Sequence, residues 1–107
     1  MAGKKSNPAP VFAALGDETR LAIVERLCGG ETLSISQLSE GSKLTRQAIT
    51  KHLKVLESAG IVHGLRSGRE TLFEYDPQPL KGLKSYIENV SAQWDDTLGR
   101  LKDFVED

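Results

Sequence analysis

Residues 44–75 decide the fold of this chain. They read LTRQAITKHLKVLESAG over residues 44–60 and IVHGLRSGRETLFEY over residues 61–75. At about 100° per residue, Ile49, Leu53 and Leu56 fall on one stripe of a helix, which must therefore face a core. Thr45 suits the N-cap because its hydroxyl can accept a hydrogen bond from a free amide of the first turn. Gly60 suits the stop because glycine enters the left-handed conformation cheaply. The pattern predicts a helix over residues 45–59.

The outer face of this predicted helix is polar and basic. It carries Gln47, Thr50, Lys51 and Lys54, with Arg46 at its edge. Two runs rich in β-branched and aromatic residues follow, over residues 61–66 and 69–75, and we expect them to pair as a hairpin joined at residues 67–68.

A second, shorter helix is predicted upstream. Ser34 and Gln37 have the spacing of a capping box, and Leu33 and Leu38 have that of a hydrophobic staple. The helix would run over residues 35–40, and Gly41 would begin the turn toward Thr45. A short helix, a glycine-containing turn and a second helix with polar N-terminal residues predict a helix-turn-helix. With the hairpin as its wing, the predicted fold is a mainly α winged helix-turn-helix of about five helices.

The N-terminal part supplies two more helices. Residues 8–15 are expected to form the first, and Asp17 is expected to cap a second that ends near residue 27. The second helix would contact the core through Leu21, Ile23, Val24 and Leu27. Residues 1–9 are mostly polar or proline and are interpreted as a flexible N-terminal arm. The rest of the chain, 10–107, is predicted to be one domain, a size usual for single domains.

The C-terminal third predicts one long amphipathic helix, over about residues 78–105. Its apolar residues recur at intervals of three or four from Leu80 to Val105, a stripe of about seven turns. A domain of this size cannot cover such a helix, so we expect a homodimer through the first and last helices. The alternative is that the stripe closes an intramolecular core. The predicted dimer interface comprises Val11, Phe12, Leu15, Leu83, Ile87, Val90, Trp94, Leu98 and Leu101.

Charge is divided unevenly along the chain, although the net charge is only −1. Residues 43–69 carry six bases and one acid, whereas residues 70–107 carry four bases and nine acids. Charge runs are often merely solvated faces, but here the positive charge coincides with a helix-turn-helix and indicates a nucleic-acid surface. The expected DNA base contacts are Arg46, Gln47, Thr50 and Lys51. The expected phosphate or wing contacts are Lys43, Thr45, Lys54, Arg66 and Arg69.

Three motifs together resemble the ArsR/SmtB family of bacterial repressors. They are DETRLAI at residues 17–23, AITKHLKVL at residues 48–56, and AGIV at residues 59–62 followed by the hairpin at residues 68–69. The similarity extends from about residue 11 to 101. It implies a homodimeric winged-helix regulator, binding double-stranded DNA, that releases its operator when an inducer binds. Two helices related by a two-fold axis would read an inverted repeat.

The residues expected of a metal sensor are missing from this sequence. Family members that sense arsenic, cadmium or lead carry a Cys-x-Cys motif, and the matching positions in this chain are Ser34 and Ser36. The hydroxyl groups of serine are poor ligands for soft metals. Zinc sensors of the family use Asp and His on the last helix, which here contains no His. The ending around Trp94 and Leu98 is similar to a non-metal-sensing branch. We therefore expect no metal, no cofactor and an inducer of unknown, non-metal type.

Single residues leave several alternatives open. His52 either contacts a phosphate or, the preferred interpretation, hydrogen-bonds within the domain. Cys28, the only cysteine, is interpreted as a buried structural thiol, with redox sensing as the alternative. Phe12, Trp94 and Phe104 either line an interface pocket or, the preferred interpretation, are ordinary packing.

Other classes of function fit the sequence less well. No nucleophile elbow or phosphate loop indicates an enzyme. The sequence shows neither an apolar run long enough to span a membrane nor the apolar segment of a secretory leader, so a cytoplasmic location is expected. The prediction is thus a sequence-specific DNA-binding regulator, with a winged-helix protein-interaction module as the alternative.

Overall fold

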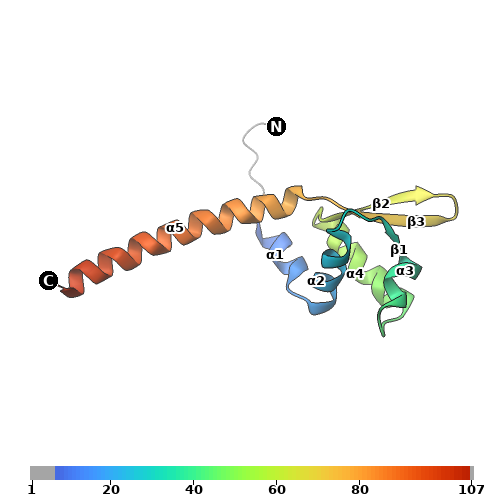
Figure 1. The fold of residues 1–107 in the computed structure, drawn as a ribbon, viewed down its shortest axis with the longest axis horizontal. Coiled ribbons are helices and arrows are strands. Elements are labelled where there is room, and N and C mark those ends of the chain that lie inside the picture. The colour runs from blue at the N-terminus through green and yellow to red at the C-terminus, as the bar shows by residue number, and fades with distance from the viewer. Residues whose placement is uncertain (1–6, 107) are drawn as a thin grey trace.

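The computed structural model of the protein describes residues 7–106 and contains five helices and three strands in that part of the chain (Figure 1). Most of the predicted arm, residues 1–6, and the side chain of Phe104 lie outside what is described. The elements are α1 (Ala9–Leu15), α2 (Glu18–Leu27), β1 (Leu33–Ser34), α3 (Ile35–Glu40), α4 (Arg46–Ser58), β2 (Val62–Ser67), β3 (Glu70–Tyr75) and α5 (Gln78–Glu106). The predicted winged helix-turn-helix is confirmed, with α3 and α4 as its helices.

The helix starts use the caps that the sequence predicts. The side chain of Asp17 accepts from the amide of Arg20, and that of Thr45 accepts from the amide of Ala48 at 3.1 Å. Ser34 and Gln37 form the full capping box, in which each side chain accepts from the other residue's amide. Each cap satisfies amides that have no partner inside the helix.

The sheet has one strand more than the sequence analysis expected. Its order is β1-β3-β2, all antiparallel, and β1 pairs Leu33 with Phe73. The predicted hairpin turn is also displaced by one residue, because Ser67 pairs with Glu70 and the two turn residues are Gly68 and Arg69. Gly68 has a φ of 62°, whereas no non-glycine residue in the described chain has a positive φ. This is the pattern of a type II′ turn, in which glycine is favoured at the first central position.

The core lies where α1 to α4 meet the sheet and the start of α5. The stripe of α4 predicted to face inward is fully covered, since Ile49, Leu53 and Leu56 are at most 1% exposed. Ile23, Val24 and Leu27 of α2 are also buried. The prediction that Leu21 contacts the core was wrong, because its side chain is 43% exposed.

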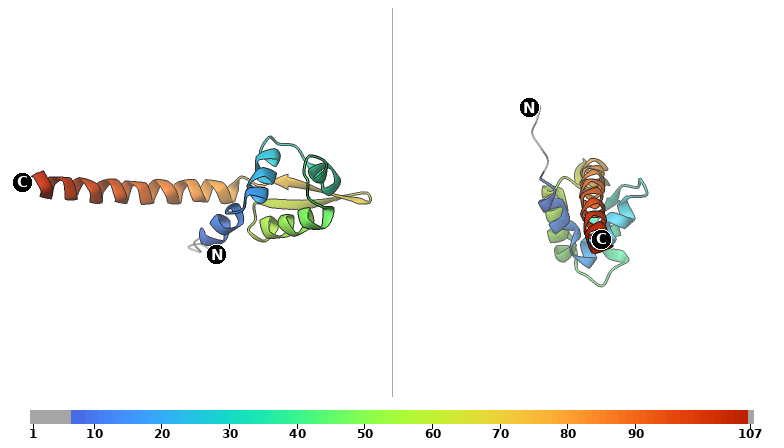
Figure 2. Two further views of the ribbon diagram at one scale, coloured as in Figure 1. Left: turned by 90° about the horizontal axis from the view of Figure 1, so that it is seen from below. Right: turned by 90° about the vertical axis from the view of Figure 1, so that its left-hand side faces the viewer.

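Helix α5 starts on the globular part and then leaves it. It runs away from the other helices and ends far from the wing, which makes the molecule 68 Å long (Figures 1 and 2). Leu83 is buried in the chain's own core, as is Val11 of α1. Beyond Leu83, the stripe is exposed at Ile87, Trp94, Leu98, Leu101 and Val105. The alternative in which the stripe closes an intramolecular core is therefore wrong.

Candidate nucleic-acid interface

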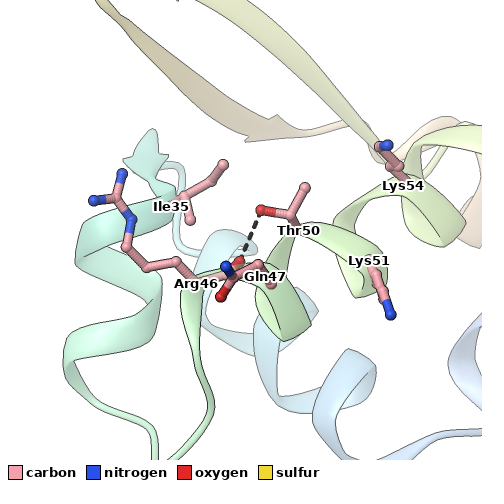
Figure 3. A pocket seen from close by; sticks show the side chains of 6 residues that line it. All are labelled: Ile35, Arg46, Gln47, Thr50, Lys51 and Lys54. Carbon is pink, nitrogen blue, oxygen red and sulfur yellow. Dashed lines mark hydrogen bonds between the residues drawn. The ribbon is translucent and has the colours of Figure 1, made fainter.

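The outward face of α4 forms a shallow depression. About 610 Å³ in volume, it is lined by Ile35, Arg46, Gln47, Thr50, Lys51 and Lys54. Figure 3 shows these side chains around the depression, with Ile35 contributed by α3 and the others by α4. The structure thus brings together the four residues predicted to contact bases, with Lys54 beside them. Arg46, Gln47, Lys51 and Lys54 are exposed, so their donors are available to a ligand.

Thr50 differs from its neighbours because its hydroxyl already has a partner. The hydroxyl donates to the carbonyl oxygen of Arg46, one turn earlier, at 2.8 Å (Figure 3). This back-bonding is a common alternative for threonine inside helices. The hydroxyl hydrogen is therefore used within the helix, which leaves the hydroxyl oxygen as an acceptor and the γ-methyl as the apolar part of the side chain.

Ile35 was not among the predicted site residues. It is the first residue of α3, half-buried, and packs against the core cluster. Its sequence context gave no signal for the site, because an apolar residue directly after an N-cap is expected in a core. Only the placement of α3 beside α4 brings it to the depression.

The residues predicted to contact phosphate lie around α4 and on the wing. Lys43 is exposed in the turn between α3 and α4. The hydroxyl oxygen of Thr45 accepts the cap hydrogen bond, which leaves its hydrogen free to donate. On the wing, the Nε of Arg66 donates to the carbonyl oxygen of Gly68 at 3.2 Å, and Arg69 is exposed at the turn. Lys43 and Thr45 thus lie just before α4, whereas Arg66 and Arg69 lie on the hairpin, which Figure 1 shows projecting from the domain at the end opposite α5.

His52 has a structural role, as preferred from the sequence. Its Nδ1 lies 3.3 Å from Nη1 of Arg20, and because arginine only donates, Nδ1 accepts. The Nε of Arg20 also donates to the carbonyl of Ala14 at 2.7 Å. His52 thereby ties α4 to α1 and α2. Beside it, the amide and the charge of Arg20 lower the pKa of Asp17 below its ordinary value of 3.8.

A second histidine joins the wing to α5. Nε2 of His63 lies 2.8 Å from Oδ2 of Asp76, whose Oδ1 accepts from the amide of Gln78 at 2.9 Å. The amide of Gln78 and then the hydrogen bond with His63 lower the pKa of Asp76. One carboxylate thus fixes both the base of the hairpin and the first turn of α5.

The interpretation of Cys28 as buried was wrong. The residue is exposed after the end of α2, because the chain turns out of the core at residues 28–30. Burial, followed by the interaction with the Cys28 thiol, raises the pKa of Tyr75.

Two kinds of feature are absent from residues 7–106. These residues hold no group of three or more His, Cys, Asp or Glu side chains placed to ligate a metal ion. Within the same residues, every helix is too short or too polar to cross a bilayer.

The arrangement of a buried α4 stripe, a cationic outer face and a flanking wing defines a winged helix-turn-helix DNA-binding domain. Residues 15–64 match the family described as "Helix-turn-helix domain". The chain is 39% identical over 89 residues to the HTH-type transcriptional regulator YuzN of Bacillus subtilis, covering 77% of this chain and 97% of that protein. It is 32% identical over 103 residues to the HTH-type transcriptional regulator Rv2034 of Mycobacterium tuberculosis, covering 85% and 95%.

Solved structures agree with these sequence relatives. The fold is similar to that of an ArsR-like transcriptional regulator from Rhodococcus sp. RHA1, with a TM-score of 0.84, 38% identity, and coverage of 92% of this chain and 89% of that chain. The chain belongs to the ArsR/SmtB family of winged helix-turn-helix regulators. It is a DNA-binding transcriptional regulator, and its family is one of regulators and not of enzymes.

Proposed function

We propose that the protein is a repressor that binds an inverted-repeat operator as a homodimer. The observation that carries the proposal is the face of α4, whose apolar stripe is buried while Arg46, Gln47 and Lys51 stand free in one depression. Arg can pair bidentately with guanine and Gln with adenine, so this face has the donors that the major groove requires. A dimer bound across a promoter would exclude the polymerase.

The proposal divides the polar and cationic residues into two groups. Arg46, Gln47, Thr50 and Lys51 lie in the first turns of α4 and approach base edges, whereas Lys54, which also lines the depression, lies further along the helix. Lys43, Thr45, Lys54, Arg66 and Arg69 contact phosphates from the borders of α4 and from the wing. Base contacts carry sequence preference, whereas phosphate contacts fix the position and supply affinity for any sequence.

The experiment compares one residue of each group. A duplex selected by the protein from a random library is titrated by fluorescence anisotropy against a scrambled duplex, at several salt concentrations. Gln47→Ala should lose about 1–3 kcal/mol of discrimination, a factor of roughly 5 to 150. Lys54→Ala should weaken both duplexes alike and flatten the salt dependence. Retained preference in Gln47→Ala would show that the reading face is misassigned.

The alternative function, a protein-interaction module, predicts a different result. Such a module needs an apolar or acidic recognition face, whereas the exposed side chains of this one include three cations. If the wild-type protein selects no sequence from the library, the protein-interaction module becomes the better description.

The proposed inducer is not a metal ion. At the position where family members place cysteine ligands, Ser34 is 4% exposed, and its hydroxyl accepts from the amide of Gln37. A hydroxyl committed to a helix cap is a poor ligand for a soft metal. We expect Zn²⁺ and arsenite to leave the anisotropy of the operator complex unchanged; release of DNA by either would contradict this.

A further inference from the structure

The reading face contains an apolar notch among its cations. We use this name for the side chain of Ile35 and the γ-methyl of Thr50, which lie together in the depression of α3 and α4 (Figure 3). The other lining residues are Arg46, Gln47, Lys51 and Lys54. Covering this apolar patch with an apolar group of a bound ligand would be favourable, because it removes the patch from water.

The notch is held in place from both sides. Ile35 lies inside the capping box of Ser34 and Gln37, and its partly buried side chain packs on the core cluster. Thr50 is fixed by its own hydrogen bond to the carbonyl of Arg46. To use that hydroxyl as a donor to a base, the protein would have to break the bond. Without breaking the bond, Thr50 can therefore offer its methyl group, and its hydroxyl oxygen only as an acceptor.

The chemistry of the major groove leaves one partner for such a notch. The base edges there present hydrogen-bond donors and acceptors, and one apolar group, the C5-methyl of thymine. A 5-methylcytosine presents the same methyl group at the same carbon. Because the notch lies on the face that carries Arg46 and Gln47, the methyl-bearing base would lie in the same half-site as the bases they read.

We propose that the notch receives the C5-methyl group of one pyrimidine in each half-site, which makes Ile35 a specificity-determining residue. The inference rests on the proposed reading of DNA by α4 and adds a residue from α3 to it. It predicts that the protein distinguishes two bases that pair identically and differ by a methyl group.

The test replaces single thymines by deoxyuridine. The half-site is first defined by selection from a random library, and each thymine is then exchanged in turn in a duplex with two intact half-sites. Burial of one methyl-sized group stabilises a complex by about 0.8 kcal/mol, so the exchange at one position should weaken binding roughly fourfold. Exchange in both half-sites should weaken it by about the square of that factor, and exchange at other positions should have little effect.

Matched variants identify the side chains responsible. Thr50→Ser removes only the methyl and keeps the hydroxyl that bonds to Arg46, whereas Thr50→Val keeps methyls and removes the hydroxyl. We expect Thr50→Ser and Ile35→Ala to lose most of the sensitivity to deoxyuridine, and Thr50→Val to retain it. Thermal melting and binding to scrambled DNA control for folding, and Thr50→Ser carries the test alone if Ile35→Ala is unfolded.

The outcomes separate this inference from the proposed function. If no sequence is selected, base reading by α4 fails and the notch fails with it. If a sequence is selected but no thymine is sensitive, or the sensitivity is unchanged in both Thr50→Ser and Ile35→Ala, the notch alone is wrong. In a duplex with a C·G pair placed at the sensitive position, replacing that cytosine by 5-methylcytosine should strengthen binding by a similar factor if the methyl group itself is recognised, and an unchanged affinity would contradict that recognition.

Discussion

At the scale of single residues, the reading helix depends on its cap. The hydroxyl of Thr45 accepts from the amide of Ala48, which otherwise has no partner inside α4. Thr45→Ala should lower the free energy of unfolding by about 1 kcal/mol, whereas Thr45→Ser should retain most of it. Urea denaturation followed by circular dichroism measures both. Equal losses in the two variants would show that the methyl group of Thr45, and not its hydroxyl, is what stabilises the helix.

Asp17 makes stability depend on pH. Because the amide of Arg20 lowers the pKa of this carboxyl in the folded protein, the carboxylate contributes its full stability above about pH 4 and loses it as the pH falls through the folded pKa. Asp17→Asn can still cap α2 but cannot ionise. The difference in unfolding free energy between wild type and Asp17→Asn should therefore shrink from pH 7 to pH 3.

Urea denaturation at pH 7, 5, 4 and 3 measures this difference. Asp95→Asn, on the exposed part of α5, controls for the loss of one negative charge. A difference that stays constant over the whole range would rule out the carboxylate as its source.

Caps could be predicted from the sequence because donor and acceptor lie three residues apart. Ser34, Thr45 and Asp17 each needed only local geometry. Leu21 and Cys28 could not be assigned in the same way, because periodicity gives the direction of a side chain around a helix but not which directions other elements cover. The same limit applies to Ile35, because it lies at the edge between the core and the outward face of α4.

At the scale of elements, the wing should act mainly through its charges. Arg66 is oriented by its hydrogen bond to the carbonyl of Gly68, and Arg69 occupies the turn. Replacing both by Ala should reduce the slope of log affinity against log salt by about 1 for each phosphate that the wing no longer neutralises. Preference for the selected sequence over a scrambled duplex should remain.

Anisotropy titrations across salt concentrations measure the slope, with Gln47→Ala as the matched comparison. That variant should lose preference and keep the slope. If the wing variant instead loses preference at an unchanged slope, the wing reads bases, and the division between α4 and the hairpin proposed above is incorrect.

The helices could be predicted from the sequence more fully than the sheet. The range of α3 and the inner stripe of α4 follow from caps and periodicity within one segment. Strand β1 has only two residues, and its pairing of Leu33 with Phe73 joins segments 40 residues apart. No local pattern indicates such a pairing. The turn was misplaced by one residue because the preference of Gly68 for a positive φ fits either neighbour as its companion.

At the scale of the whole molecule, the apolar stripe of α5 is largely uncovered in a single chain. Its stripe follows one face for several turns after leaving the core, with Trp94 60% and Leu98 54% exposed. Phe12 of α1 lies against it through an edge-to-face contact with Tyr86, whose ring centroid is 6.0 Å away. Helices α1 and α5 thus share one apolar surface, which a second copy of the chain would cover. The sequence could predict this surface because the periodicity continues past any length that one domain can bury.

Dimerisation should determine how tightly the operator is held. Trp94→Asp places a charge at the centre of the stripe and should convert the dimer into a monomer, measured by size-exclusion chromatography with light scattering. Ala92→Asp adds the same charge about 160° away around α5 and should leave the dimer intact.

Once one half-site is bound, a dimer binds the second intramolecularly, so loss of the dimer should weaken binding to the full inverted repeat by on the order of a hundredfold or more. Binding to an isolated half-site should be nearly the same for both variants, since α4 is far from either change. A monomeric Trp94→Asp that binds the full repeat as tightly as Ala92→Asp would mean that each α4 reads DNA independently, and the proposed two-fold operator would then have no physical basis.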